Sequence, residues 1–175
     1  ATEAVKAVAS ASKLDHNLKY LTLQMENGFA DEVGVALAEA LTVNKTLSRI
    51  SLAFDCFPYW AHRATLGAPA YEAFSAMLGV NTSLILELPP FGNTVDDERL
   101  VDSHNQMCIE QRLNQVGRGN LLSPSQTKTM WMDALDKLNL ISRKAGDTIE
   151  LHVSCLYSLL CMNPSALFGD GRSFN

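Results

Sequence analysis

The sequence predicts an α/β fold in which short parallel strands lie side by side and helices cover one face of the sheet. Three observations support this fold class. The pattern L-x-x-L-x-L occurs at residues 18–23 and 47–52, an amphipathic helical stretch follows each copy, and both stretches end in a Val-Asn-Lys/Thr-Thr/Ser-Leu turn at 43–47 and 80–84. One such unit cannot bury its own apolar face, so we expect successive units to stack into a solenoid.

Composition and charge limit the classes of function. The chain has 175 residues, 47% of them hydrophobic and 19% charged, which is typical of one globular domain. Its formal net charge of −5 argues against a nucleic-acid partner, which would require a basic face. No run approaches the ~18 consecutive apolar residues of a membrane-spanning helix, so we expect no insertion into a membrane.

Each strand should point its apolar residues inward, because side chains alternate along a strand. The third strand, over residues 84–88, departs from the pattern by a one-residue deletion, with Ser83 at the first leucine position. Pro89 and Pro90 end this strand, since proline cannot donate to the ladder. The prediction is one parallel sheet in chain order that buries Leu21, Leu23, Ile50, Leu52, Leu86 and Leu88, with the helices on the opposite side.

The second sequence repeat is longer than the first and contains an aromatic insert. Repeat starts at Leu18 and Leu47 are 29 residues apart, whereas the next start, at Leu84, follows after 37. Residues 56–64 are the natural place for the additional residues. This insert carries Phe57, Tyr59 and Trp60, which either fold back over the end of the helix layer or anchor a partner.

The strand pattern, the helix sequence Ala-Leu-Ala-Glu-Ala-Leu at 36–41 and the repeated Asn-containing turn resemble the ribonuclease-inhibitor-like class of leucine-rich repeats, whose units have about 28 residues. The resemblance covers residues 14–91. It implies a solenoid of short parallel strands backed by helices. Residues 4–14 resemble the end of one more such helix, so we expect either that earlier repeats precede Ala1 or that this helix is a cap.

The second half of the chain is expected to be a helical cap, which divides the protein into residues 1–91 and 92–175. An acidic turn at 96–98 should begin the first helix, and Ser-Pro-Ser-Gln at 123–126 resembles a capping box that begins the second. A similar box at 147–150 should begin the third. Residues 112–118, with Trp131 and the segment 159–164, also resemble the closing tail of ribonuclease-inhibitor-like proteins in algal lineages.

The cysteines are interpreted as free thiols in a reducing intracellular compartment, the cytoplasm or nucleus. They are Cys56, Cys108, Cys155 and Cys161. No secretory signal is visible, although a removed import sequence stays open. A zinc site on the helix with His152, Cys155 and Cys161 would need four ligands, and the sequence offers no C-x-x-C partner. Cys56 with His62, as a nucleophile and its base, lacks a third orienting group. We therefore expect neither metal nor cofactor.

Alternation along the strands defines the positions on the exposed face of the sheet. They are Tyr20, Thr22 and Gln24 in the first strand, Arg49, Ser51 and Ala53 in the second, and Ile85, Glu87 and Pro89 in the third. This mixed surface has no charge cluster, which suits a protein partner better than a small anion. The alternative is an ordinary solvated sheet without a binding role.

The resulting functional prediction is a non-catalytic protein–protein interaction or scaffold module within a multiprotein complex. Its partner contacts would come from the exposed strand face and from the aromatic insert. Two other functions stay open. The chain is either an obligate structural subunit of a larger assembly or, as the third choice, a cysteine-dependent enzyme.

Overall fold

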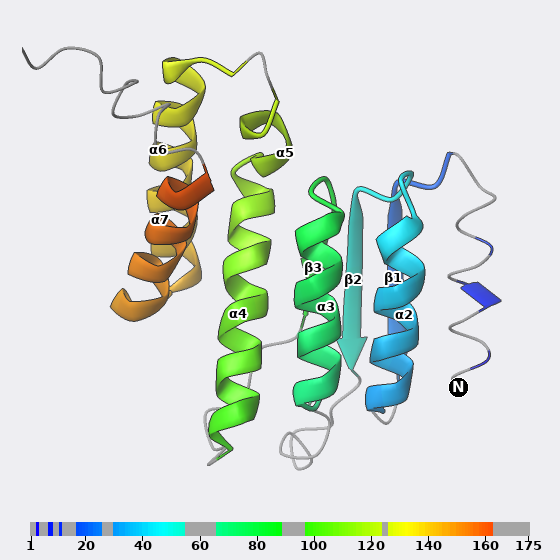
Figure 1. Ribbon diagram of the computed structural model, residues 1–175. Coiled ribbons are helices and arrows are strands. Elements are labelled where there is room, and N and C mark those ends of the chain that lie inside the picture. The colour runs from blue at the N-terminus through cyan, green and yellow to red at the C-terminus, as the bar shows by residue number, and fades with distance from the viewer. Residues whose placement is uncertain are drawn as a thin grey trace, which may run out of the picture. The chain divides into compact units, whose positions relative to one another are not determined.

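The protein is an α/β chain with a three-stranded sheet, seen in a computed structural model (Figure 1). The structure describes residues 3, 7, 8 and 11 and the ranges 17–25, 30–54, 66–88, 97–123 and 126–162. Its elements are β1 (Tyr20–Met25), α2 (Asp31–Val43), β2 (Arg49–Phe54), α3 (Ala68–Val80), β3 (Ile85–Glu87), α4 (Glu98–Gln115), α5 (Arg118–Leu121), α6 (Lys128–Ala145) and α7 (Ile149–Met162). They form two compact units, Ala1–Gln111 and Arg112–Asn175.

The sheet has the predicted parallel arrangement, with strand order β1-β2-β3. Tyr20 is in register with Arg49, and Arg49 with Ile85. Helices α2 and α3 both lie over the same face of the strands, as Figure 1 shows. The predicted chain order and the position of the helices on one side of the sheet are therefore confirmed.

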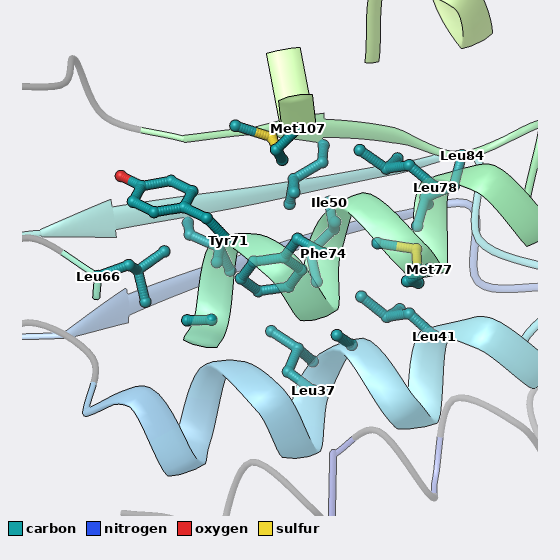
Figure 2. Packing of buried hydrophobic residues seen from close by; sticks show 14 of the residues in the cluster. Leu37, Leu41, Ile50, Leu66, Tyr71, Phe74, Met77, Leu78, Leu84 and Met107 are labelled. Carbon is teal, nitrogen blue, oxygen red and sulfur yellow. The ribbon is translucent and has the colours of Figure 1, made fainter. Parts of the chain in front are cut away.

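A single apolar core fills the space between this sheet and its helices. The buried residues of β2 and β3 meet those of α2 and α3, with Phe74 at the centre of the view in Figure 2. Ile50, Leu52 and Leu86 are buried as predicted. The core also includes Leu37, Leu41, Leu66, Tyr71, Met77, Leu78, Leu84 and Met107.

Leu21, Leu23 and Leu88 are only partly buried, which corrects the prediction that all six strand positions lie inside the core. Leu21 and Leu23 belong to β1, which is an edge strand of the described sheet, so β2 covers it on one side only. Leu88 follows the last residue of the short β3 strand. The density of neighbours, rather than the alternation of side chains, accounts for the difference.

The strands begin two residues later than the leucine pattern suggests for β1 and β2. Leu47 is buried within the turn that precedes β2 and is not part of the strand. The one-residue deletion at the third strand is confirmed, because Ile50 pairs with Leu86. The buried turn leucine Leu47 lies three positions before Ile50, whereas its counterpart Leu84 lies only two positions before Leu86. The position of the deletion differs from the prediction, however, because Ser83 is exposed and Leu84 is fully buried.

Two buried asparagines hold the turns between helix and strand. Asn44 accepts hydrogen bonds through Oδ1 from the backbone N–H groups of Thr46 (2.9 Å) and Leu47 (2.8 Å). Asn81 occupies the matching position of the next turn, and its Nδ2 donates to the carbonyls of Leu41 (2.9 Å) and Asn44 (2.7 Å). The repeated asparagine therefore connects one turn to the preceding one.

The helix starts in the C-terminal half agree with the sequence in two cases and differ in one. Asp97 caps α4 by accepting from Leu100 N, and Thr148 caps α7 by accepting from Leu151 N. The expected start of α6 at Ser123 is wrong, because this helix begins at Lys128 and Thr127 accepts from Met130 N. Thr127 has the extended backbone of an N-cap residue, and its side chain satisfies one of the orphan N–H donors of the first turn.

The division into two compact units falls within α4, between Gln111 and Arg112. The predicted boundary between repeats and cap at residue 91 stays a prediction. Leu100 and Met107, both from the first part of this helix, join the core of the first unit. Arg99 of α4 also forms an ion pair with Glu72 of α3, with Nε 3.0 Å from Oε1. The first part of α4 therefore continues the helix layer that α2 and α3 form, before the chain enters the second unit.

Candidate protein-binding face

The predicted strand-face residues lie on adjacent strands in aligned rows. One row holds Tyr20, Arg49 and Ile85, and the next holds Thr22, Ser51 and Glu87. Gln24 and Ala53 form the start of a third row. Most of these side chains are exposed, with Tyr20 at 69%, while Ser51, Ala53 and Ile85 are partly covered. Pro89 lies outside the described residues.

An ion pair crosses this face diagonally from β2 to β3. Arg49 Nη1 is 3.5 Å from Glu87 Oε1, and the two side chains are 49% and 46% exposed. Solvent screens such a pair, so it contributes little to stability. Both groups can therefore exchange their mutual contact for a contact with a partner at small energetic cost.

The strand face combines a rigid base with polar and aromatic groups that can reach a partner. The inward side of the same strands carries Ile50 and Leu86, both with 0% exposure, which fixes the backbone that presents the outward residues. Exposed Tyr20 and Arg49 belong to the residue types that most often anchor protein interfaces. The arrangement can provide hydrogen bonds, ring contacts and one positive charge to a protein surface.

The aromatic insert, the second predicted contact, lies outside the described residues, and its role stays a prediction. This holds for Phe57, Tyr59 and Trp60. Cys56 and His62, which formed one of the candidate catalytic pairs, lie in the same segment. The strand-face residues are therefore the predicted contacts that the structure brings together.

The described cysteines Cys108, Cys155 and Cys161 are free thiols. Cys155 is fully buried, which disfavours its predicted alternative use as a nucleophile together with His152. In the described part of the chain, no group of three His, Cys, Asp or Glu side chains is placed to hold a metal ion. Over those same residues, the helices lack the combination of length and apolarity that crossing a membrane requires.

A thiol–imidazole pair in the first unit was not recognised in the sequence. Cys108 Sγ lies 3.6 Å from His104 Nε2, and the His104 ring meets Tyr71 edge-on at a centroid distance of 5.1 Å. Burial lowers the pKa of His104 and raises the pKa of Tyr71 well above its usual range. A histidine with a lowered pKa is a weak base, so this pair favours packing over catalysis. The spacing of four residues on one helix was the available signal.

A small pocket in the second unit was also missed. It lies where α6 ends and α7 begins, and its wall includes Ser142 and His152. Neither the hydroxyl oxygen of Ser142 nor Nδ1 of His152 has a hydrogen-bond partner among the described residues. The sequence holds no motif for it, because the two residues come together only through the packing of the helices.

Comparisons with protein-family models, with curated proteins and with solved structures gave no match to this chain.

Proposed function

We propose that this chain is a leucine-rich-repeat solenoid of the ribonuclease-inhibitor-like class and acts as a non-catalytic protein-binding module. The observation that carries the proposal is the contact of Asn81 with the carbonyls of Leu41 and Asn44. Asparagines at equivalent turn positions are directly bonded, which fits a stack in which each repeat contacts its neighbour.

A second contact joins the same two proposed repeats at the opposite end of their helices. Asp31, in the first turn of α2, accepts a hydrogen bond from the backbone N–H of Gly67 (2.6 Å), immediately before α3. Helices α2 and α3 are thus linked at both ends, and their strands keep a common register. This regularity supports the interpretation of residues 18–88 as consecutive repeats.

The binding role is assigned to the strand face, defined as Tyr20, Thr22, Gln24, Arg49, Ser51, Ile85 and Glu87. A surface with an exposed tyrosine and an exposed arginine fits a protein partner. We place the module in a reducing intracellular compartment, and the three free described thiols support this placement.

A specific observation favours the alternative of an obligate subunit. Three apolar side chains of α7 at spacings of four residues are exposed, namely Ile149 (79%), Val153 (55%) and Tyr157 (69%). Such a stripe is costly in a free protein and is covered in an assembly. Sedimentation of the purified chain separates the two functions: a stable monomer supports the recognition module, and self-association that Val153→Asp abolishes supports the obligate subunit.

Site-specific photocrosslinking tests the binding role directly. A photoreactive phenylalanine derivative replaces Thr22 on the strand face or, as the matched control, Glu39 on the exposed side of α2. The proposal expects a defined protein adduct in native extract from position 22 that Tyr20→Ala and Arg49→Ala both reduce. Equal adducts from positions 22 and 39, or no adduct from position 22, would contradict it.

A further inference from the structure

The pocket of the second unit has a volume of about 300 Å³. It lies at a tight turn, in which Gly146 has a left-handed backbone conformation with φ of 68°. In this turn the carbonyl oxygen of Ser142 accepts hydrogen bonds from the backbone N–H groups of Gly146 and Asp147. The volume is at the lower end of the range for small-molecule sites, so it suits a small ligand or one end of a larger one.

The wall of the pocket carries a buried hydroxyl group without a partner. Ser142 is 5% exposed, and its Oγ forms no hydrogen bond within the described part of the chain. A helical serine commonly donates to the carbonyl four residues earlier, as Ser103 does to Arg99 (2.7 Å). Buried polar atoms are nearly always bonded, so an unpartnered one calls for an explanation.

His152 supplies a second such atom on the same wall. Its Nδ1 is buried and has no partner among the described residues. Ser142 belongs to α6 and His152 to α7, so two elements each contribute to the wall a residue with an unsatisfied polar atom. A ligand that bonds to both would remove two unfavourable desolvation terms at once.

The remaining charge on the wall is positive. Asp147 is paired with Arg112, whose Nη2 and Nε lie 2.8 Å and 3.0 Å from its two carboxylate oxygens. The other polar features of the wall that can attract an anion are the guanidinium of Arg143 and the N-terminal end of α7. A helix N-terminus attracts anions through its unpaired N–H groups. Among the lining residues, the charge that the ion pair of Asp147 with Arg112 does not neutralise is therefore that of the Arg143 guanidinium.

We propose that this pocket binds the oxyanion group of a small molecule, a carboxylate or a phosphate. The group would lie at the start of α7 with Arg143 beside it, and Ser142 and His152 would supply hydrogen bonds. Both side chains must turn toward the ligand, because their unpartnered atoms have almost no contact with solvent. Serine reaches its other staggered rotamers by rotation about one bond. The inference is independent of the proposed function.

The test is a titration of the full chain with sodium acetate and, separately, with inorganic phosphate at constant ionic strength. Nuclear magnetic resonance follows the backbone amides of Ile149 and Glu150 and the ring of His152. The proposal expects saturable shifts at these nuclei, and the anion that binds more tightly identifies the source of the oxyanion.

Two substitutions make the test specific. Arg143→Gln should weaken binding about tenfold, as expected for one lost hydrogen bond to a charged group. The matched control is Lys144→Gln, which removes a neighbouring exposed charge that is not on the wall and should leave the affinity unchanged. The proposal is overturned if neither anion causes saturable shifts, or if Lys144→Gln weakens binding as much as Arg143→Gln does.

Discussion

The side-chain amide of Asn81 donates a 2.7 Å hydrogen bond to the backbone carbonyl of Asn44, the asparagine at the equivalent position of the preceding turn. Both residues are 1% exposed, so the bond is shielded from water. A second bond from the same amide reaches Leu41 O. One side chain therefore satisfies two carbonyl groups near the end of α2 and connects the turn after α3 to the turn after α2.

Asn81→Ala should lower the stability of the first unit strongly. The substitution leaves two buried carbonyls without this donor, and each unsatisfied group costs about 1–3 kcal/mol. Urea unfolding followed by circular dichroism measures the change. Asn139→Ala, on the exposed part of α6, is the control and should change the free energy of unfolding little. Equal effects from the two substitutions would contradict the role of Asn81.

Alanine substitutions at the two buried serines Ser142 and Ser103 should differ in their effect on the melting temperature, because of the two only the Ser142 hydroxyl has no hydrogen-bond partner within the described part of the chain. Ser142→Ala should leave the melting temperature unchanged or raise it, because alanine removes an unsatisfied polar atom and favours helix. Ser103→Ala should lower it, since Ser103 Oγ donates to Arg99 O. Calorimetry of both variants gives the comparison. A loss of stability in Ser142→Ala as large as in Ser103→Ala would show that Ser142 has a partner.

The Arg112–Asp147 pair should be essential to the second unit. Its side chains are only 14% and 5% exposed, and removing one member leaves a buried charge, at a cost of about 3–5 kcal/mol. Arg112→Met should therefore unfold this unit at much lower urea concentration. Arg99→Met removes the more exposed partner of Glu72 and should shift the urea midpoint only slightly. Similar shifts in both variants would be the contrary result.

His104 should make the first unit sensitive to mild acid. Burial lowers the pKa of His104 in the folded state, whereas the unfolded chain takes up this proton near its ordinary value of about 6.5. The contribution of neutral His104 is complete above that value and decreases as the pH falls toward the folded-state pKa. His104→Phe, which keeps an aromatic ring beside Tyr71, should reduce the loss of stability between pH 7.5 and pH 5. An unchanged pH dependence in this variant would assign the effect to other groups.

Periodicity and the repeated turn predicted the parallel sheet, its strand order and its exposed face. These features depend on local alternation, which the sequence displays directly in residues such as Leu21 and Ile50. The degree of burial at Leu21 was not predictable in the same way. It depends on how many strands cover β1, and that is a property of the assembled sheet.

Long-range contacts account for the features that the sequence did not indicate. The repeated asparagine was visible as a pattern, but its bond from Asn81 to Asn44 joins residues 37 positions apart. The pocket beside Ser142 depends on how α7 packs against α6 after a tight turn. The start of α6 was misplaced because Ser123 and Thr127 are both suitable caps, and local sequence does not decide between them.

The central claim is that the strand face recognises a protein. The most direct test is the dissociation constant of the complex with the partner that the photoreactive residue at position 22 identifies. The double variant Tyr20→Ala, Arg49→Glu should weaken this complex by about 2 kcal/mol or more while the melting temperature hardly changes, because both side chains point away from the core. Glu39→Ala, on α2, should bind normally. Unchanged affinity in the double variant, together with loss of binding in a folded Trp60→Ala variant, would contradict the claim and assign recognition to the aromatic insert.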